Sequence, residues 1–139
     1  MNRAHDWLDQ ARHDLEHARK SKDMGDYNWA CFAAQQAAGK AIKAVHLRFG
    51  QVARGSSPSQ LLEALPEVEL PTEVLDAARV LDKHYITPRY PDVYPAGAAY
   101  RKYIKAEADE AVRLAEKILV FCESHLYSCN SLDRLPGTK

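Results

Sequence analysis

A short segment in the second half of the chain combines a cation, a phenol and a carboxylate with two prolines. Arg89, Tyr90 and Asp92 follow Pro88, and Pro91 lies between the last two of them. Each proline fixes its own φ and disfavours helical geometry in the residue before it, so we expect these side chains to stand on an extended, partly rigid backbone. A guanidinium on such a backbone is suited to bidentate contact with a phosphate, so this segment is the first candidate site.

The chemistry of this segment depends on how its polar groups are used. Metal-free cleavage of a phosphodiester needs a base for the attacking hydroxyl, a cation for the phosphorane charge and an acid for the leaving oxygen. Arg89 supplies the cation, Asp92 can orient it or accept a proton, and Tyr94 can donate one. These three are the candidate catalytic residues. In the structural alternative, Arg89 and Asp92 pair in a salt bridge that closes the loop while Tyr90 packs against the bundle.

A second group of polar residues lies in an alanine-rich stretch. Gln36 and Lys40 are four residues apart, so they share one face of a helix. If that face meets the proline-rich loop, Gln36, Lys40 and Arg89 form a small polar pocket suited to phosphate, with Tyr90 beside them as a further binding residue. The alternative, which we favour for the neighbouring Lys43, is a solvated face.

Four polar residues step along the start of the chain at intervals of four, namely His5, Asp9, His13 and His17. Two histidines at this spacing can chelate zinc on a helix. The glutamate of an HExxH motif is missing, however, and histidines on the polar side of an amphipathic helix are ordinarily surface groups. We expect no metal site and no cofactor.

Composition places these candidates in one globular domain. The chain has 139 residues, 46% hydrophobic and 27% charged, which suits a single core. Lys plus Arg and Asp plus Glu balance at 19 each, so any affinity for nucleic acid or anionic lipid must come from a local patch.

The cysteines at 31, 122 and 129 lack metal-type spacing, and no apolar run approaches about 18 residues. We expect a cytoplasmic protein with reduced thiols and no membrane contact.

Apolar residues recur at helical spacing through most of the chain. The pattern predicts an amphipathic helix over about 4–22 and a second helix over about 27–49, with Asp26 as its N-cap. A mixed stripe along the second helix, which includes Cys31, Ile42 and Val45, is flanked by a line of alanines at positions 30, 34, 37 and 41. Such small side chains let neighbouring backbones approach closely, which indicates the central helix of a bundle.

Three further helices are predicted in the second half. Ser57, Pro58 and Gln60 form a capping box that starts a short helix over about 58–65. A fourth helix begins near residue 71 or 72 and stops before Pro88, and a last one extends over about 100–126. The predicted fold is all-α, an antiparallel up-and-down bundle of four main helices plus one short helix. Residues 1–127 form this bundle, and residues 128–139 are expected to be a flexible tail.

Several motifs, in this order along the chain, resemble the HEPN domain family. They are the stretch Asp26–Phe32 (DYNWACF), the run Gln35–Ala44 (QQAAGKAIKA) and the sequence Arg89–Asp92 (RYPD). The resemblance covers nearly the whole chain and implies a helical bundle that commonly forms homodimers. It also implies a stand-alone prokaryotic protein encoded beside a minimal nucleotidyltransferase, in pairs that act as toxin and antitoxin. In such pairs the HEPN chain is often an RNase, and some members bind nucleotides.

Two positions depart from the family pattern. HEPN RNases carry an arginine followed a few residues later by a histidine, whereas no histidine follows Arg89 in that range and His84 precedes it. Gly39 stands where many relatives have a glutamate beside the lysine. The resemblance therefore implies binding of RNA or nucleotide phosphate, with RNase activity weak or absent. The alternative is a non-catalytic nucleotide-binding or protein-interaction module in which the RYPD loop is structural.

Overall fold

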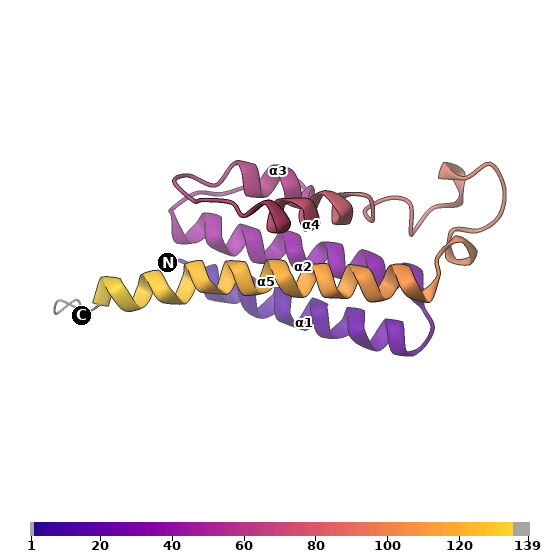
Figure 1. The fold of residues 1–139 in the computed structure, drawn as a ribbon, viewed down its shortest axis with the longest axis horizontal. Helices are drawn as coiled ribbons and strands as arrows, with labels where there is room; N and C mark the ends of the chain where they lie inside the picture. The colour runs from indigo at the N-terminus through magenta and orange to yellow at the C-terminus, as the bar shows by residue number, and fades with distance from the viewer. Residues whose placement is uncertain (1, 135–139) are drawn as a thin grey trace.

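The fold of the protein is an all-α bundle with four long helices (Figure 1). The computed structural model describes the backbone of residues 2–134 and the side chains of residues 2–127. Along the chain its elements are α1 (Ala4–Asp23), α2 (Tyr27–Arg48), α3 (Pro58–Glu63), α4 (Thr72–Asp82), the short 3-10 turns η1 (Pro91–Val93) and η2 (Ala99–Lys102), and α5 (Lys105–Arg134). No strand occurs in that part of the chain. The predicted fold class is confirmed.

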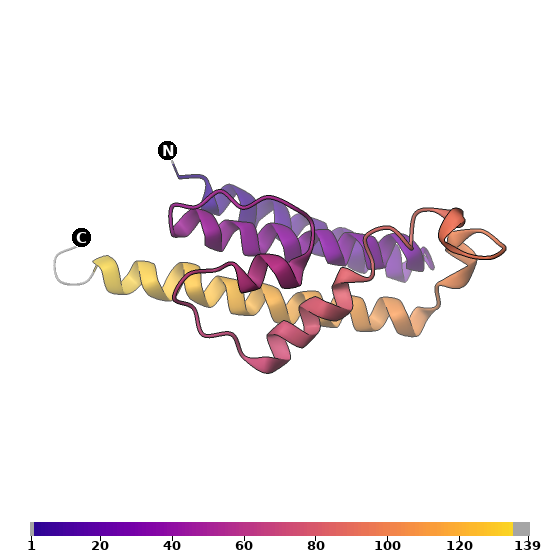
Figure 2. The ribbon, with the colours of Figure 1, turned by 90° about the horizontal axis from the view of Figure 1, so that it is seen from above.

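Helix α2 is the centre of the bundle, as its alanines predicted. It packs against α1 and α5 over most of its length and also contacts α3 and α4. Figures 1 and 2 show α1, α2 and α5 side by side, with α3 and α4 on the side of α2 away from α1. Ala30, Ala34, Ala37, Ala38 and Ala41 are completely buried. Because these side chains are small, neighbouring backbones can lie close together, and the core is built from many short contacts.

The predicted Ser57 N-cap of α3 is confirmed and has a partner that the sequence did not reveal. The Ser57 hydroxyl oxygen accepts a hydrogen bond from the Gln60 backbone N–H at 3.2 Å. The Asp82 carboxylate, at the end of α4, accepts from the Ser57 hydroxyl at 2.9 Å, from the Ser59 N–H at 3.2 Å and from the Ser59 hydroxyl. Asp82 therefore joins the end of α4 to the beginning of α3.

Most predicted helix bounds are confirmed, but two details differ. Asp26 is the residue before α2, as predicted, but its side chain makes no capping bond. Helix α4 begins at Thr72 and ends before Pro88, as predicted, whereas the last helix begins at Lys105 instead of Tyr100 because the backbone at Tyr103 is extended. Propensity alone does not place such boundaries, since competing turns and caps decide them.

The predicted tail is only partly described. Helix α5 extends beyond Leu126 to Arg134, so residues 128–134 have a helical backbone. Residues 135–139 lie outside the described residues, and the flexibility of the tail stays a prediction. Over the described part of the chain, no helix is long and apolar enough to cross a bilayer.

Candidate functional site

The loop between α4 and α5 is tied to the bundle by hydrogen bonds. Asn28 of α2 is buried, and its amide Nδ2 donates to the Pro88 carbonyl oxygen at 3.0 Å. The Tyr94 hydroxyl donates to the Thr87 carbonyl oxygen at 3.0 Å. These bonds fix the backbone of the segment that leads into Arg89. Tyr94, a candidate catalytic residue, therefore has its hydroxyl hydrogen engaged in holding the loop.

The guanidinium of Arg89 lies among three aromatic rings. Its Cζ is 4.1 Å from the ring centre of Phe32, 4.8 Å from that of Tyr85 and 5.2 Å from that of Tyr90. Its Nε donates to the Tyr85 carbonyl oxygen at 2.8 Å. The negative faces of the rings stabilise the cation and hold its plane, as cation–π contacts do within about 6 Å.

Among the residues that the structure describes, no acidic side chain forms an ion pair with Arg89. Within residues 2–127, Arg89 forms no ion pair, and its polar partner is Tyr85, through the carbonyl oxygen that accepts from Nε and through the side-chain hydroxyl. The salt bridge to Asp92 that the structural alternative required is therefore not formed, and Asp92 is exposed. Tyr90 is 46% exposed and contacts Arg89 from the solvent side of the loop. The arrangement leaves a positioned cation without a carboxylate partner, which is what bidentate recognition of a phosphate or carboxylate needs.

Arg89 lines a cavity of about 340 Å³ at the junction of the loop and the beginning of α2. Trp29 and Tyr100, which are 45% and 55% exposed, are among the other lining residues. Asn28 and Asp26 also border it, so the cavity offers aromatic faces, an amide and a carboxylate beside the guanidinium. Hydrogen bonding to Ser56, and then the charge of Arg89, lower the pKa of the nearby Tyr85 hydroxyl.

The structure places Gln36 and Lys40 in an adjoining hollow instead of beside Arg89. This hollow, about 240 Å³, lies between α1 and α2 and shares Trp29 with the first cavity. Lys40 Nζ lies 2.6 Å from an oxygen of Asp14, so its charge is already compensated. Gln36 Nε2 donates to the side-chain oxygen of Gln35 at 2.9 Å. Asp14 was not a candidate in the sequence, because its partner lies on another helix, 26 residues further along the chain.

His84 does not face the candidate site. It is buried, and its Nδ1 lies 3.1 Å from the Tyr103 hydroxyl, which in turn lies 2.8 Å from the Thr87 hydroxyl. Burial lowers the pKa of His84, despite the opposing charges of Glu107 and Glu110. The histidine thus belongs to a polar network beneath the loop and is a structural group here.

The burial of His84 predicts how stability varies with pH. Because its pKa is lower in the folded protein than the ordinary 6.5, the unfolded chain binds the proton more readily, and stability is lost as pH falls below about 6.5. Urea unfolding at about pH 7.5 and about pH 5.5 measures this loss. The variant His84→Gln should show a smaller difference between the two pH values. An unchanged difference would mean that other groups, such as the partly buried His125, carry the whole effect.

The histidines of α1 do not form a metal centre. No group of His, Cys, Asp and Glu suited to a metal ion occurs among the residues that the structure describes. His5 instead stacks on Tyr127, with ring centres 5.5 Å apart, and His17 borders the hollow beside Lys40.

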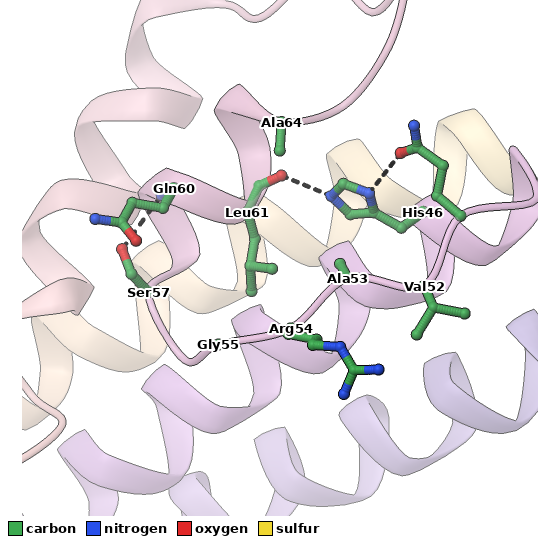
Figure 3. Close-up of a pocket in the computed structure, with 10 residues that line it drawn as sticks. His46, Val52, Ala53, Arg54, Gly55, Ser57, Gln60, Leu61 and Ala64 are labelled. Carbon is green, nitrogen blue, oxygen red and sulfur yellow. Dashed lines mark hydrogen bonds between the residues drawn. The ribbon is translucent and has the colours of Figure 1, made fainter.

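A separate hollow of about 460 Å³ lies where the end of α2 meets α3 (Figure 3). Its buried polar group, His46, has partners on both ring nitrogens: Nδ1 lies 2.9 Å from Gln51 Oε1, and Nε2 lies 2.8 Å from the Leu61 carbonyl oxygen. Figure 3 shows that these two contacts join the end of α2 to the loop that follows it and to α3. His46 was not a candidate in the sequence, and its role here is to connect these elements.

The helical bundle and the loop arginine define a class of small all-α proteins, and comparison with known proteins identifies the family. The model of the HEPN domain matches residues 4–125. The protein belongs to the HEPN domain family. No match was found among curated proteins.

Three solved structures share both sequence and fold with the chain. TT1696 from Thermus thermophilus is 59% identical, with a TM-score of 0.88, and the match covers 90% of this chain and 99% of that one. ST0689, an archaeal HEPN homologue, is 43% identical with a TM-score of 0.76, covering 89% and 98% of the two chains. A HEPN domain protein, TM0613 from Thermotoga maritima, is 44% identical with a TM-score of 0.71, covering 86% and 96%.

Proposed function

We propose that this HEPN protein binds the phosphate of RNA or a nucleotide at Arg89. The observation that carries the proposal is a guanidinium held by three rings and one carbonyl, with no carboxylate paired to it in the described residues. A held guanidinium loses little conformational freedom on binding, which favours affinity. Tyr90 stacks beside the phosphate, and Gln36 and Lys40 are accessory contacts from the adjoining hollow.

Titration of the wild-type protein tests this proposal directly. Calorimetry with ATP and with a short single-stranded RNA at low salt should show saturable binding of at least one of them, and inorganic phosphate should compete. Absence of binding by both ligands would remove the proposed function. It would leave the alternative, an interaction module whose loop is structural.

We propose further that the protein acts in a two-component, toxin–antitoxin-like pair with a minimal nucleotidyltransferase. The pairing is supported by the family resemblance alone. Its test is therefore whether the two proteins form a complex. Co-expression with a neighbouring gene that encodes such an enzyme should yield a complex that survives gel filtration. Separate elution of the two proteins, with each of them folded, would contradict this pairing.

Cleavage of RNA is expected to be weak or absent. Asp92 and Tyr94 are the remaining candidates for proton transfer, but Tyr94 already donates to the Thr87 carbonyl and His84 faces the interior. Loss of a positioned proton carrier typically lowers a rate by about 10²- to 10⁴-fold. The measurement is single-turnover decay of labelled RNA in EDTA. Robust cleavage that disappears in Asp92→Asn or Tyr94→Phe would overturn the expectation and identify the substitute group.

A homodimer is the expected assembly. The outer face of α2 exposes 45% of Trp29 and part of Phe32, and Met24 in the preceding turn is 82% exposed. Apolar groups gathered at one place suit a self-complementary two-fold patch, which would also bring two Arg89 loops towards a shared groove. Light scattering should give about twice the 15.6 kDa monomer mass at micromolar concentration. A mass near that of the monomer, unchanged in Trp29→Ser, would contradict it.

A further inference from the structure

A chain of hydrogen bonds lies beneath the loop that carries Arg89. His84 follows the end of α4, and Tyr103 lies between η2 and α5. Both side chains are only 8% exposed, and the half-buried Thr87 joins them. Figures 1 and 2 show the segment between α4 and α5 extending beyond the end of the bundle. Contacts made within this segment must therefore contribute to its order.

The hydrogen of each group in this chain can be assigned from its neighbours. A carbonyl only accepts, so the Thr87 hydroxyl donates to the Lys83 carbonyl oxygen at 2.8 Å. Having no second hydrogen, the Thr87 hydroxyl accepts from the Tyr103 hydroxyl, 2.8 Å away. The Tyr103 oxygen can then only accept from His84 Nδ1, at 3.1 Å. A neutral His84 ring must therefore carry its hydrogen on Nδ1 and not on Nε2.

This chain ends close to the groups that orient the guanidinium. Thr87 lies two residues before Arg89, and its own carbonyl oxygen accepts from the Tyr94 hydroxyl at 3.0 Å. The backbone N–H of Arg89 donates to the Ile86 carbonyl oxygen at 3.0 Å, and its Nε donates to the Tyr85 carbonyl oxygen at 2.8 Å. The acceptors that hold Arg89 thus belong to the residues just before Thr87. A turn of the backbone at Thr87 would move them.

We infer that Tyr103 and His84 are positioning residues for the phosphate site, which act on Arg89 through Thr87. The inference rests on the proposed function and adds the groups that hold its cation in place. Bidentate contact with a phosphate requires a fixed guanidinium plane. If the loop spent part of its time in other orientations, the apparent affinity would fall in proportion to the competent fraction.

The variant Tyr103→Phe tests the inference, because it removes the hydroxyl and keeps the ring that packs against His84, 5.6 Å between ring centres. NMR hydrogen exchange of the Arg89 Nε–H should become faster by at least about threefold. Calorimetry should show ATP binding weakened about 3- to 10-fold, as expected for the loss of a hydrogen bond that favours the competent loop. Both measurements are made well below the unfolding transition.

Two controls separate positioning from a general loss of stability. Tyr127→Phe removes another hydroxyl of α5, one that accepts from Arg12 at 3.4 Å, and should change neither measurement. Arg19 Nε donates to Glu116 at 3.1 Å, in a contact between α1 and α5. Its Nε–H exchange, read in the same spectra, should be equal in wild type and Tyr103→Phe.

The direction of the chain is tested at His84. His84→Leu removes the donor and should weaken ATP binding as Tyr103→Phe does. His84→Asn places an amide nitrogen near the position of Nδ1, where it can donate to the Tyr103 oxygen, so it should restore most of the affinity. Nitrogen-15 spectra of the wild-type imidazole should place the hydrogen on Nδ1.

Three outcomes would overturn the inference. Exchange at Arg89 or ATP affinity could be unchanged in Tyr103→Phe, exchange at Arg89 and Arg19 could accelerate equally, or the His84 hydrogen could lie on Nε2. In each case ATP binding by the wild type would still support the proposed function. The exchange measurement needs no ligand. If the wild type bound no ATP, the proposed function would fail, while faster exchange in Tyr103→Phe would still show that the chain orders Arg89.

Discussion

Replacing Arg89 with alanine is expected to weaken binding of ATP or a short RNA by ~1.5 to 3 kcal/mol, about 10- to 150-fold. This is the range for a hydrogen bond to a charged group, and the guanidinium has no acid in the described residues with which a ligand must compete. Folding stability should fall by less, because cation–π contacts near the surface are individually weak, about 0.5–1 kcal/mol each. Calorimetric titration and thermal melting of the same samples measure the two effects.

Two further variants sharpen this experiment. Arg89→Lys keeps the charge but loses the planar fork, so its affinity should fall between those of wild type and Arg89→Ala. Arg113→Ala removes an exposed arginine from α5 and should leave binding unchanged. If Arg89→Ala bound normally but melted at a clearly lower temperature, the guanidinium would be a structural group and the loop would have no phosphate site.

Truncating Ile42 is expected to have the largest effect on stability. This side chain is completely buried in the central helix. Removing three carbons there leaves a cavity that close-packed alanines on neighbouring turns cannot fill, because they have no flexible side chains to move into it. The loss for Ile→Ala at such sites is typically ~2 to 5 kcal/mol.

Urea unfolding of Ile42→Ala, with Val120→Ala as the control, measures this loss. Val120 is 66% exposed on α5, so its truncation should change the free energy of unfolding by less than about 0.5 kcal/mol. Equal losses in the two variants would show that α2 is not the packing centre of the bundle. Below the unfolding transition, Ile42→Ala should still bind ATP, because none of the contacts that hold the Arg89 guanidinium involves Ile42.

The pairing of Lys40 with Asp14 changes the expectation for the binding surface. From the sequence, Lys40 and Arg89 were both candidates for a phosphate contact. In the structure one cation is compensated at 2.6 Å and the other is not. A ligand gains more from the uncompensated charge, since it displaces no existing ion pair. The proposed function therefore assigns the principal contact to Arg89 and an accessory role to Lys40.

The sequence by itself determined the features that depend on near neighbours. Helical periodicity, the alanine line of α2 and the Ser57 N-cap of α3 all involve residues within one or two turns of each other, and all are confirmed. The ordered motifs also identified the family. Helix ends were less certain, because at Asp82 and Tyr103 short-range turns compete with an otherwise favourable helical pattern.

Only the tertiary structure decided which polar groups are free. Asp14 meets Lys40, Asp82 meets Ser57 and Ser59, and Phe32 covers Arg89, yet the partners in each case come from different elements of the chain. Spacing along the chain cannot reveal such contacts, because they arise from the way whole helices pack. The adjacent Arg89 and Asp92 looked like a pair from spacing, but the backbone turns the guanidinium towards the rings of Phe32 and Tyr85. The free charge that makes Arg89 a candidate site is thus a property of the fold.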